Sequence, residues 1–194
     1  SSAASDVYKR QVFAQRDHKG VWRIIHEIVT YDMGLERFAI LLKEDINRFF
    51  PKHDIVVFGD PAGSQRSTLN EDTSFDHLKT HGILAKPCAT NNFKTRREAL
   101  AMPMTRLIDG KPGFRIDRKC VRLRKSLAGG YHFKRVAIGA GQERFRDTPN
   151  KNEHSHIGDA AQYCLLGSEY RTMTRGKSRQ LQPMVAKIDF DPLA

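Results

Sequence analysis

The sequence predicts an α/β fold built on a mixed sheet. Short apolar runs typical of strands alternate with segments whose apolar residues recur at helical spacing. The first two strand-like runs are joined by a four-residue turn, which makes that pair antiparallel. A length of 194 residues fits one domain with a sizeable core. No apolar run approaches the roughly 18–20 residues that span a bilayer, so no membrane partner is expected.

The first half of the chain supplies a hairpin, a helix and a buried strand. Residues 12–16 and 21–29 are strand-like and flank Asp17-His-Lys-Gly20, whose residue types favour a turn. Residues 34–50 carry apolar side chains at helical spacing, and Pro51 follows where the helix has to end. Residues 54–60 are continuously apolar until Asp60, which predicts a strand buried on both faces.

The second half continues the alternation of helices and strands. The predicted elements are a helix over 73–81 with a capping box at Thr73 and Asp76, a strand over 83–88, a helix over 94–108 kinked at Pro103, a strand over 114–117, a helix over 120–128, a hairpin over 131–138 and 143–146, and a helix over 156–166. A leading hairpin followed by alternating strands and helices suits an RNase H-like fold, a mixed sheet flanked by helices.

The chain divides into three parts. Residues 1–11, SSAASDVYKRQ, look like translated sequencing-adapter sequence, and we expect them to be a non-native leader. Residues 12–170 form the predicted domain. Residues 171–194 are polar and basic and then contain prolines, which is typical of a tail or linker.

The charge balance predicts an anionic partner. Lys and Arg total 33 and Asp and Glu total 22, a net charge of +11. Nucleic acid is the first candidate, and the alternative is a basic surface without a specific partner. The three cysteines lack metal-finger spacing, so we expect reduced thiols in a cytoplasmic setting.

Two aspartates are the candidate catalytic residues. Asp60 lies where a predicted buried strand breaks into the Gly59–Gly63 turn, and ligands of open α/β sheets bind at the carboxyl ends of strands. Asp159 falls in the first turn of the last predicted helix. Together they could hold Mg²⁺ or Mn²⁺, which prefer hard oxygen ligands. The alternatives are an Asp60 that bonds only turn amides and an Asp159 that only complements the helix dipole.

With these residues in place, the sequence resembles the nuclease domain of phage terminase large subunits. The matching pieces are, in order, Gly59-Asp-Pro-Ala-Gly63 with Arg66, Gly82-Ile83, Thr90-Asn91, Arg97-Glu-Ala99, Ile116-Asp117 with Cys120, Leu127-Ala-Gly-Gly-Tyr131, and Ser155-His156 with Asp159-Ala160 and Tyr163. They cover roughly residues 12–166, and their order is more specific than any single piece.

The resemblance implies a metal-dependent endonuclease that cuts concatemeric viral DNA during genome packaging. Asp60 matches an acid on a central strand and Asp159 the last acid of a two-metal cluster. The family's first acid lies just upstream of the stretch matched by residues 12–15, where this chain has the adapter-like segment. We therefore expect a poor nuclease. No G-x-x-x-x-G-K-[ST] loop occurs, so no ATP site is expected, although the complete family proteins carry an ATPase domain.

The resemblance also implies partners and a location. The partners are double-stranded viral DNA and, in the full-length context, the small terminase subunit and the portal protein. The location is the cytoplasm of a bacterial host, transiently at the prohead portal. A different RNase H-like nuclease such as a resolvase is one alternative, and a non-catalytic DNA-binding, portal-docking module is the other.

Further residues have predicted supporting roles. Asp117 is an alternative metal ligand because it also ends a strand. Lys151 could stabilise charge on phosphate, and His156 could orient Asp159. The alternatives are that Arg118 and Lys119 simply neutralise Asp117, that Lys151 is an exposed lysine and that His156 caps the start of the helix. The candidate DNA-binding residues are Arg66, Arg96, Arg97, Arg118, Lys119, Arg122, Lys134 and Arg135. Basic side chains on a solvated helix face are the alternative for this group.

Overall fold

The computed structural model describes residues 9–64, 73–138 and 142–176. Its strands are β1 (Arg10–Arg16), β2 (Trp22–Val29), β3 (Val57–Gly59), β4 (Ala85–Pro87), β5 (Leu107–Ile108), β6 (Lys111–Pro112), β7 (Phe114–Ile116), β8 (Phe133–Ile138) and β9 (Gln142–Pro149). Its helices are α1 (Leu35–Phe49), the 3-10 turn η1 (Pro61–Ser64), α2 (Ser74–Thr80), α3 (Phe93–Thr105), α4 (Val121–Lys125), the π-helical turn η2 (Ser126–Gly130) and α5 (Glu153–Gly176).

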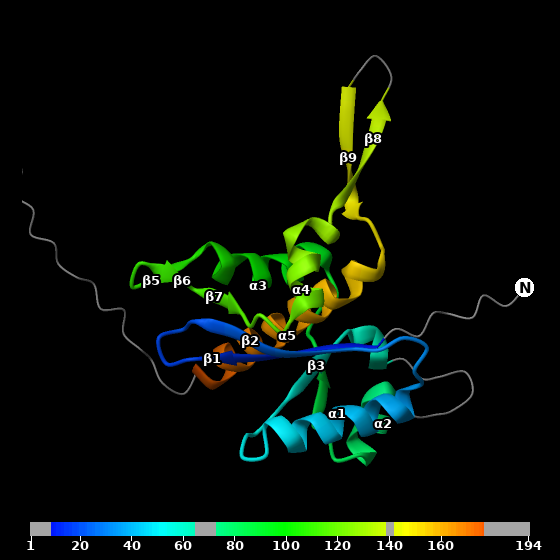
Figure 1. The fold of residues 1–194 in the computed structure, drawn as a ribbon, viewed down its shortest axis with the longest axis vertical. Helices are drawn as coiled ribbons and strands as arrows, with labels where there is room; N and C mark the ends of the chain where they lie inside the picture. Colours follow the sequence, from blue (N-terminus) through cyan, green and yellow to red (C-terminus); the bar gives the residue numbers. More distant parts are fainter. Residues whose placement is uncertain (1–8, 65–72, 139–141, 177–194) are drawn as a thin grey trace, which may run out of the picture.

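The sheet is mixed and has helices on both faces, so the predicted α/β class is confirmed. β1 pairs antiparallel with β2, and β2 pairs parallel with β7. β3 and β4 form a separate parallel pair. Figure 1 shows α1 and α2 on one side of these strands and α3, α4 and α5 on the other.

The alternation of side chains along β1 and β2 builds two cores. Val12 and Ile24 are each 1% exposed and pack towards α3, α4 and α5, together with Leu123 and Leu165. Phe13 faces the opposite way and packs with residues of α1 and α2. Consecutive side chains of a strand point to opposite faces, so one hairpin serves both layers.

Several predicted boundaries were wrong. The helix predicted over 94–108 ends at Thr105, because Asp109 and Gly110 take positive φ and turn β5 back onto β6. Asp-Gly is a strong signal for such a turn. The last helix begins at Glu153 rather than 156 and continues to Gly176 rather than 166. The capping box at Thr73 and Asp76 is present as predicted.

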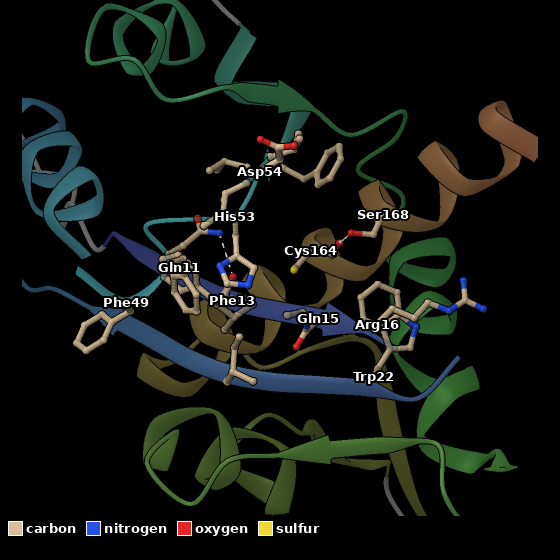
Figure 2. A pocket seen from close by; sticks show the side chains of 18 residues that line it. Gln11, Phe13, Gln15, Arg16, Trp22, Phe49, His53, Asp54, Cys164 and Ser168 are labelled. Carbon is tan, nitrogen blue, oxygen red and sulfur yellow. Dashed lines mark hydrogen bonds between the residues drawn. The ribbon is translucent and has the colours of Figure 1, made fainter. Parts of the chain in front are cut away.

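Figure 2 shows a groove of about 660 Å³ between the two parts of the sheet. β1 lines one side of it and residues 54–58 line the other. Within the described residues β1 and β3 do not pair with each other. Cys164 and Ser168 of α5 close one face, and Phe49 and Phe50, at the end of α1, lie at the other.

The close packing of α5 on β3 predicts a sensitive position. A Cβ atom on Gly167 would overlap the Phe58 ring and approach its Cβ within 2.7 Å, which that side chain cannot avoid by rotating. We expect Gly167→Ala to lower the free energy of unfolding by about 1–3 kcal/mol. Gly34→Ala is the matched control, because a Cβ there meets nothing within 4 Å. Equal urea midpoints for the two variants would contradict this packing.

Candidate functional site

Asp60 lies directly after β3, at the start of η1. One of its carboxylate oxygens, Oδ1, accepts a hydrogen bond of 2.9 Å from the Ala62 amide. The Phe75 ring of α2 lies against this turn: a Cβ on Gly59 would be 3.3 Å from it and a Cβ on Gly63 3.1 Å. The two glycines therefore let α2 pack closely beside Asp60. The Asp60 side chain is exposed and available to a ligand.

Asp159 lies in the second turn of α5, because that helix begins earlier than predicted. The effect of the helix dipole fades after the first turn. The dipole alone therefore does not explain an acid at this position. Its side chain is only 14% exposed. Oδ1 lies 2.7 Å from both the Tyr131 hydroxyl and Arg96 Nη1, and Oδ2 lies 2.6 Å from Lys151 Nζ.

Arg96 was predicted as a DNA contact, and that prediction does not fit its position. The residue is 7% exposed and forms an ion pair with Asp159. Its guanidinium carbon lies 5.3 Å from the centre of the Phe93 ring and 5.0 Å from that of Tyr163. A guanidinium held between aromatic rings beside a carboxylate positions that carboxylate and does not reach a phosphate at the surface.

Tyr163 links the two candidate acids. Burial raises the pKa of its hydroxyl, as do a hydrogen bond to Asp60 and the charges of Asp60 and Asp159, while Arg96 opposes them. Burial and a hydrogen bond to Asp159 likewise raise the pKa of Tyr131. Both tyrosines therefore stay protonated and donate to the carboxylates. The structure thus brings Asp60 and Asp159, 99 residues apart in sequence, around one tyrosine and one arginine.

The two tyrosines had been noted only within the family resemblance. A sequence signal for Tyr163 existed, because it lies four residues after Asp159 on one helix and so shares its face. No comparable signal marks Tyr131, whose approach to Asp159 depends on the packing of η2 against α5.

Lys151 and His156 lie near Asp159, where their supporting roles were predicted. Lys151 Nζ contacts Asp159, and its side chain remains 59% exposed. The pKa of His156 is lowered by burial first and then by the positive charges of Lys151 and Arg10, against the opposing charge of Asp159. His156 is therefore held towards its neutral form beside the carboxylate.

Asp117, the alternative metal ligand, lies in a different neighbourhood. It is exposed after β7 and accepts a hydrogen bond of 2.9 Å from the Lys119 amide in its own turn. Burial raises the pKa of Cys120, and the negative charges of Glu27 and Asp117 add to this rise. The Glu27 carboxylate accepts the Arg122 and Leu123 amides at the start of α4. The described contacts of Asp117 do not connect it to Asp60 or Asp159.

Most of the other predicted DNA-binding residues are exposed. Arg66 lies outside the described residues. The exposed members are Arg97, Arg118, Lys119, Arg122, Lys134 and Arg135. Lys134 and Arg135 belong to β8, which with β9 forms a hairpin that projects from the body of the protein (Figure 1). Arg144 and Arg146 of β9 are also exposed on this hairpin.

The donor set suits one divalent cation better than two. Asp60 and Asp159 provide hard carboxylate oxygens, and Mg²⁺ retains several waters when it has few protein ligands. Lys151 now neutralises one oxygen of Asp159, but its exposed side chain can move aside. Arg96 is buried, so it remains paired with Asp159. Two carboxylates, one of them paired with a fixed cation, have too little negative charge for a second ion among the described residues.

Comparisons with known proteins give one structural likeness. The crystal structure of the large terminase nuclease from the thermophilic phage G20c with bound cobalt matches with a TM-score of 0.46 and 12% sequence identity, and the match covers 81% of each chain. No protein-family model and no curated protein matches the sequence. A likeness of this size does not establish an activity, so the site must be judged on its own side chains. No described helix is long and apolar enough to cross a membrane.

Thiol reactivity tests the burial around the site. Burial raises the pKa of Cys88 to about 11, with Asp60 adding to the effect, and raises that of Cys120 to about 12. At pH 8 both thiolates are therefore about 100-fold or more scarcer than in the unfolded chain. We expect slow iodoacetamide labelling of both residues until denaturant is added. Because the folded pKa values exceed the unfolded one, their contribution to stability is lost as the pH rises above about 9. Rapid native labelling would contradict this burial.

Proposed function

We propose that this chain is a divalent-metal-dependent DNA endonuclease of the phage terminase type, with an RNase H-like fold. One observation carries the proposal: two carboxylates from distant parts of the chain are joined by one set of contacts. Tyr163 hydrogen-bonds to Asp60 and lies against Arg96, which pairs with Asp159. An antiparallel hairpin at the start of the chain and a parallel β3–β4 pair that presents Asp60 at its carboxyl end favour the same fold.

Each side chain of the site has a task in phosphodiester cleavage. A divalent cation bound by Asp60 and Asp159 would supply an activated water and offset the charge that develops on phosphate. Arg96 and Tyr131 fix the Asp159 carboxylate, and Tyr163 orients Asp60. Lys151 is the mobile cation, which can exchange Asp159 for a phosphate oxygen of the DNA when the metal binds.

The wider role is part of the proposal. The substrate is double-stranded viral DNA during genome packaging, with the small terminase subunit and the portal as partners in the bacterial cytoplasm and at the prohead. Mg²⁺ or Mn²⁺ is the proposed cofactor. The described residues provide two carboxylates, so we expect slow cleavage.

Plasmid nicking tests the activity. Supercoiled plasmid incubated with the full chain and Mn²⁺ should be nicked slowly, and EDTA should stop the reaction. No metal-dependent nicking of plasmid or linear duplex would overturn the proposal. Strong preference for four-way junctions over linear duplex would instead favour a resolvase.

A non-catalytic DNA-binding module is the second candidate, and one observation favours it. Arg96 and Lys151 already pair with Asp159, as they would in a purely structural network. Such a module should bind duplex DNA and give neither nicking nor a metal-binding heat.

The projecting hairpin predicts how DNA binding responds to charge reversal. Lys134→Glu with Arg135→Glu removes two candidate phosphate contacts, so the slope of log K against log salt should become shallower by about 2. Lys52→Glu with Lys79→Glu is the matched control, on the α1–α2 side of the molecule (Figure 1). Fluorescence anisotropy on duplex DNA measures both. Equal slopes for the two double variants would contradict DNA contact through the hairpin.

A further inference from the structure

Three potential metal ligands meet at the junction of α1 and α2. Glu36 comes from the first turn of α1, His77 from α2 and His81 from the residue that ends α2. Glu36 Oε2 lies 2.6 Å from His77 Nε2, and Oε1 lies 3.1 Å from His81 Nε2. All three ligand atoms lie within 4.8 Å of one another.

The chemistry and spacing of this group suit zinc. Zn²⁺ binds imidazole nitrogen and carboxylate oxygen at about 2.0–2.2 Å, so two ligand atoms of a tetrahedral site are roughly 3.3 Å apart. Two histidines four residues apart share one helix face and aim at one point. The Nε2 atom of His77 is buried and faces the Glu36 carboxylate.

We propose that Glu36, His77 and His81 bind one Zn²⁺ ion, with water as the fourth ligand. This site is separate from the acids of the proposed nuclease centre and uses none of them. The carboxylate oxygens at Asp60 favour a hard cation such as Mg²⁺, whereas imidazole nitrogens together with a carboxylate favour Zn²⁺. The two sites therefore select different ions.

The bound ion would hold α2 in place. α2 carries Phe75, and the Phe75 ring lies against the two glycines that flank Asp60. Fixing His77 and His81 to Glu36 of α1 therefore restrains the helix that packs on the Asp60 turn. The role of this ion is structural, and its loss should loosen α2 and residues 59–64 together.

Zinc binding to the chelator-treated full chain tests the site. Calorimetry should show one Zn²⁺ per chain, and Zn²⁺ at about 100 times its Kd should raise the Tm by about 5–10 °C. Co²⁺ at the same site should give the intense visible absorption of tetrahedral coordination. His77→Ala and Glu36→Gln should each weaken Zn²⁺ binding by at least about 10-fold. His18→Ala, in the exposed β1–β2 turn, is the control.

Hydrogen exchange distinguishes a bound Zn²⁺ ion from ion pairs alone, because ion pairs would not make the exchange rate depend on Zn²⁺. Zn²⁺ should slow exchange in α2 and in residues 59–64 of the wild type and leave the Glu36→Gln variant unchanged. Equal Zn²⁺ affinity in the wild type and the His77→Ala variant, or no rise in Tm, would show that Glu36 and the histidines form only ion pairs.

Discussion

Arg96→Met is expected to lower the free energy of unfolding by about 3 kcal/mol. The substitution leaves the largely buried Asp159 carboxylate without its buried cation, and removing one member of a buried pair typically costs 3–5 kcal/mol. The lower end applies because Lys151 and Tyr131 still contact Asp159. Urea unfolding followed by circular dichroism measures the change.

The neighbouring arginine provides the matched control for this prediction. Arg97 is on the same helix, has a half-exposed side chain and pairs with exposed Glu98. Exposed pairs contribute at most about 1 kcal/mol, so Arg97→Met should change stability by less than about 0.5 kcal/mol. If the two variants unfold at the same urea concentration, Arg96 is not the buried support of Asp159.

Asp60→Asn is expected to keep the fold and to lower metal-dependent nicking by at least about 100-fold. The side chain is exposed, and an asparagine oxygen can still accept the Ala62 amide, so the turn is preserved. The substitution removes a full negative charge from a site with two carboxylates, which weakens its hold on the cation. Unchanged thermal unfolding together with lost nicking would assign the effect to the site and not to the fold.

The same change at Asp159 would be a less clean experiment. Asp159→Asn leaves Arg96 buried beside a neutral group, so stability and metal binding should fall together. Nicking by Asp60→Asn at the wild-type rate would contradict a role for that carboxylate, whatever the behaviour of Asp159→Asn.

Local signals made much of the fold predictable. The β1–β2 hairpin follows from turn residues between alternating strands, and α2 from a capping box that the structure contains. The end of α3 was missed because Leu107 and Ile108 continue its helical pattern of apolar residues, although Asp109-Gly110 marks a turn. The start of α5 was missed because Asn152, whose side chain accepts the His154 and Ser155 amides, was not recognised as the cap.

The site was predictable only in part. Asp60 and Asp159 were predicted from their places at the end of a strand and near the start of a helix. Arg96 was misassigned because it adjoins Arg97 in a basic stretch, and sequence alone does not tell which of two adjacent arginines faces the core. The packing of α3 against α5 decides that. Glu36, His77 and His81 were missed because the ligand atoms meet only when α1 and α2 pack together.

Manganese binding tests the central claim most directly, that Asp60 and Asp159 hold a divalent cation together. The titration is best done in a His77→Ala, His81→Ala background, so that the proposed zinc site cannot contribute. Calorimetry should then show one Mn²⁺ per chain, with the heat lost on adding Asp60→Asn. An isotherm that Asp60→Asn leaves unchanged, or no binding at all, would contradict the account.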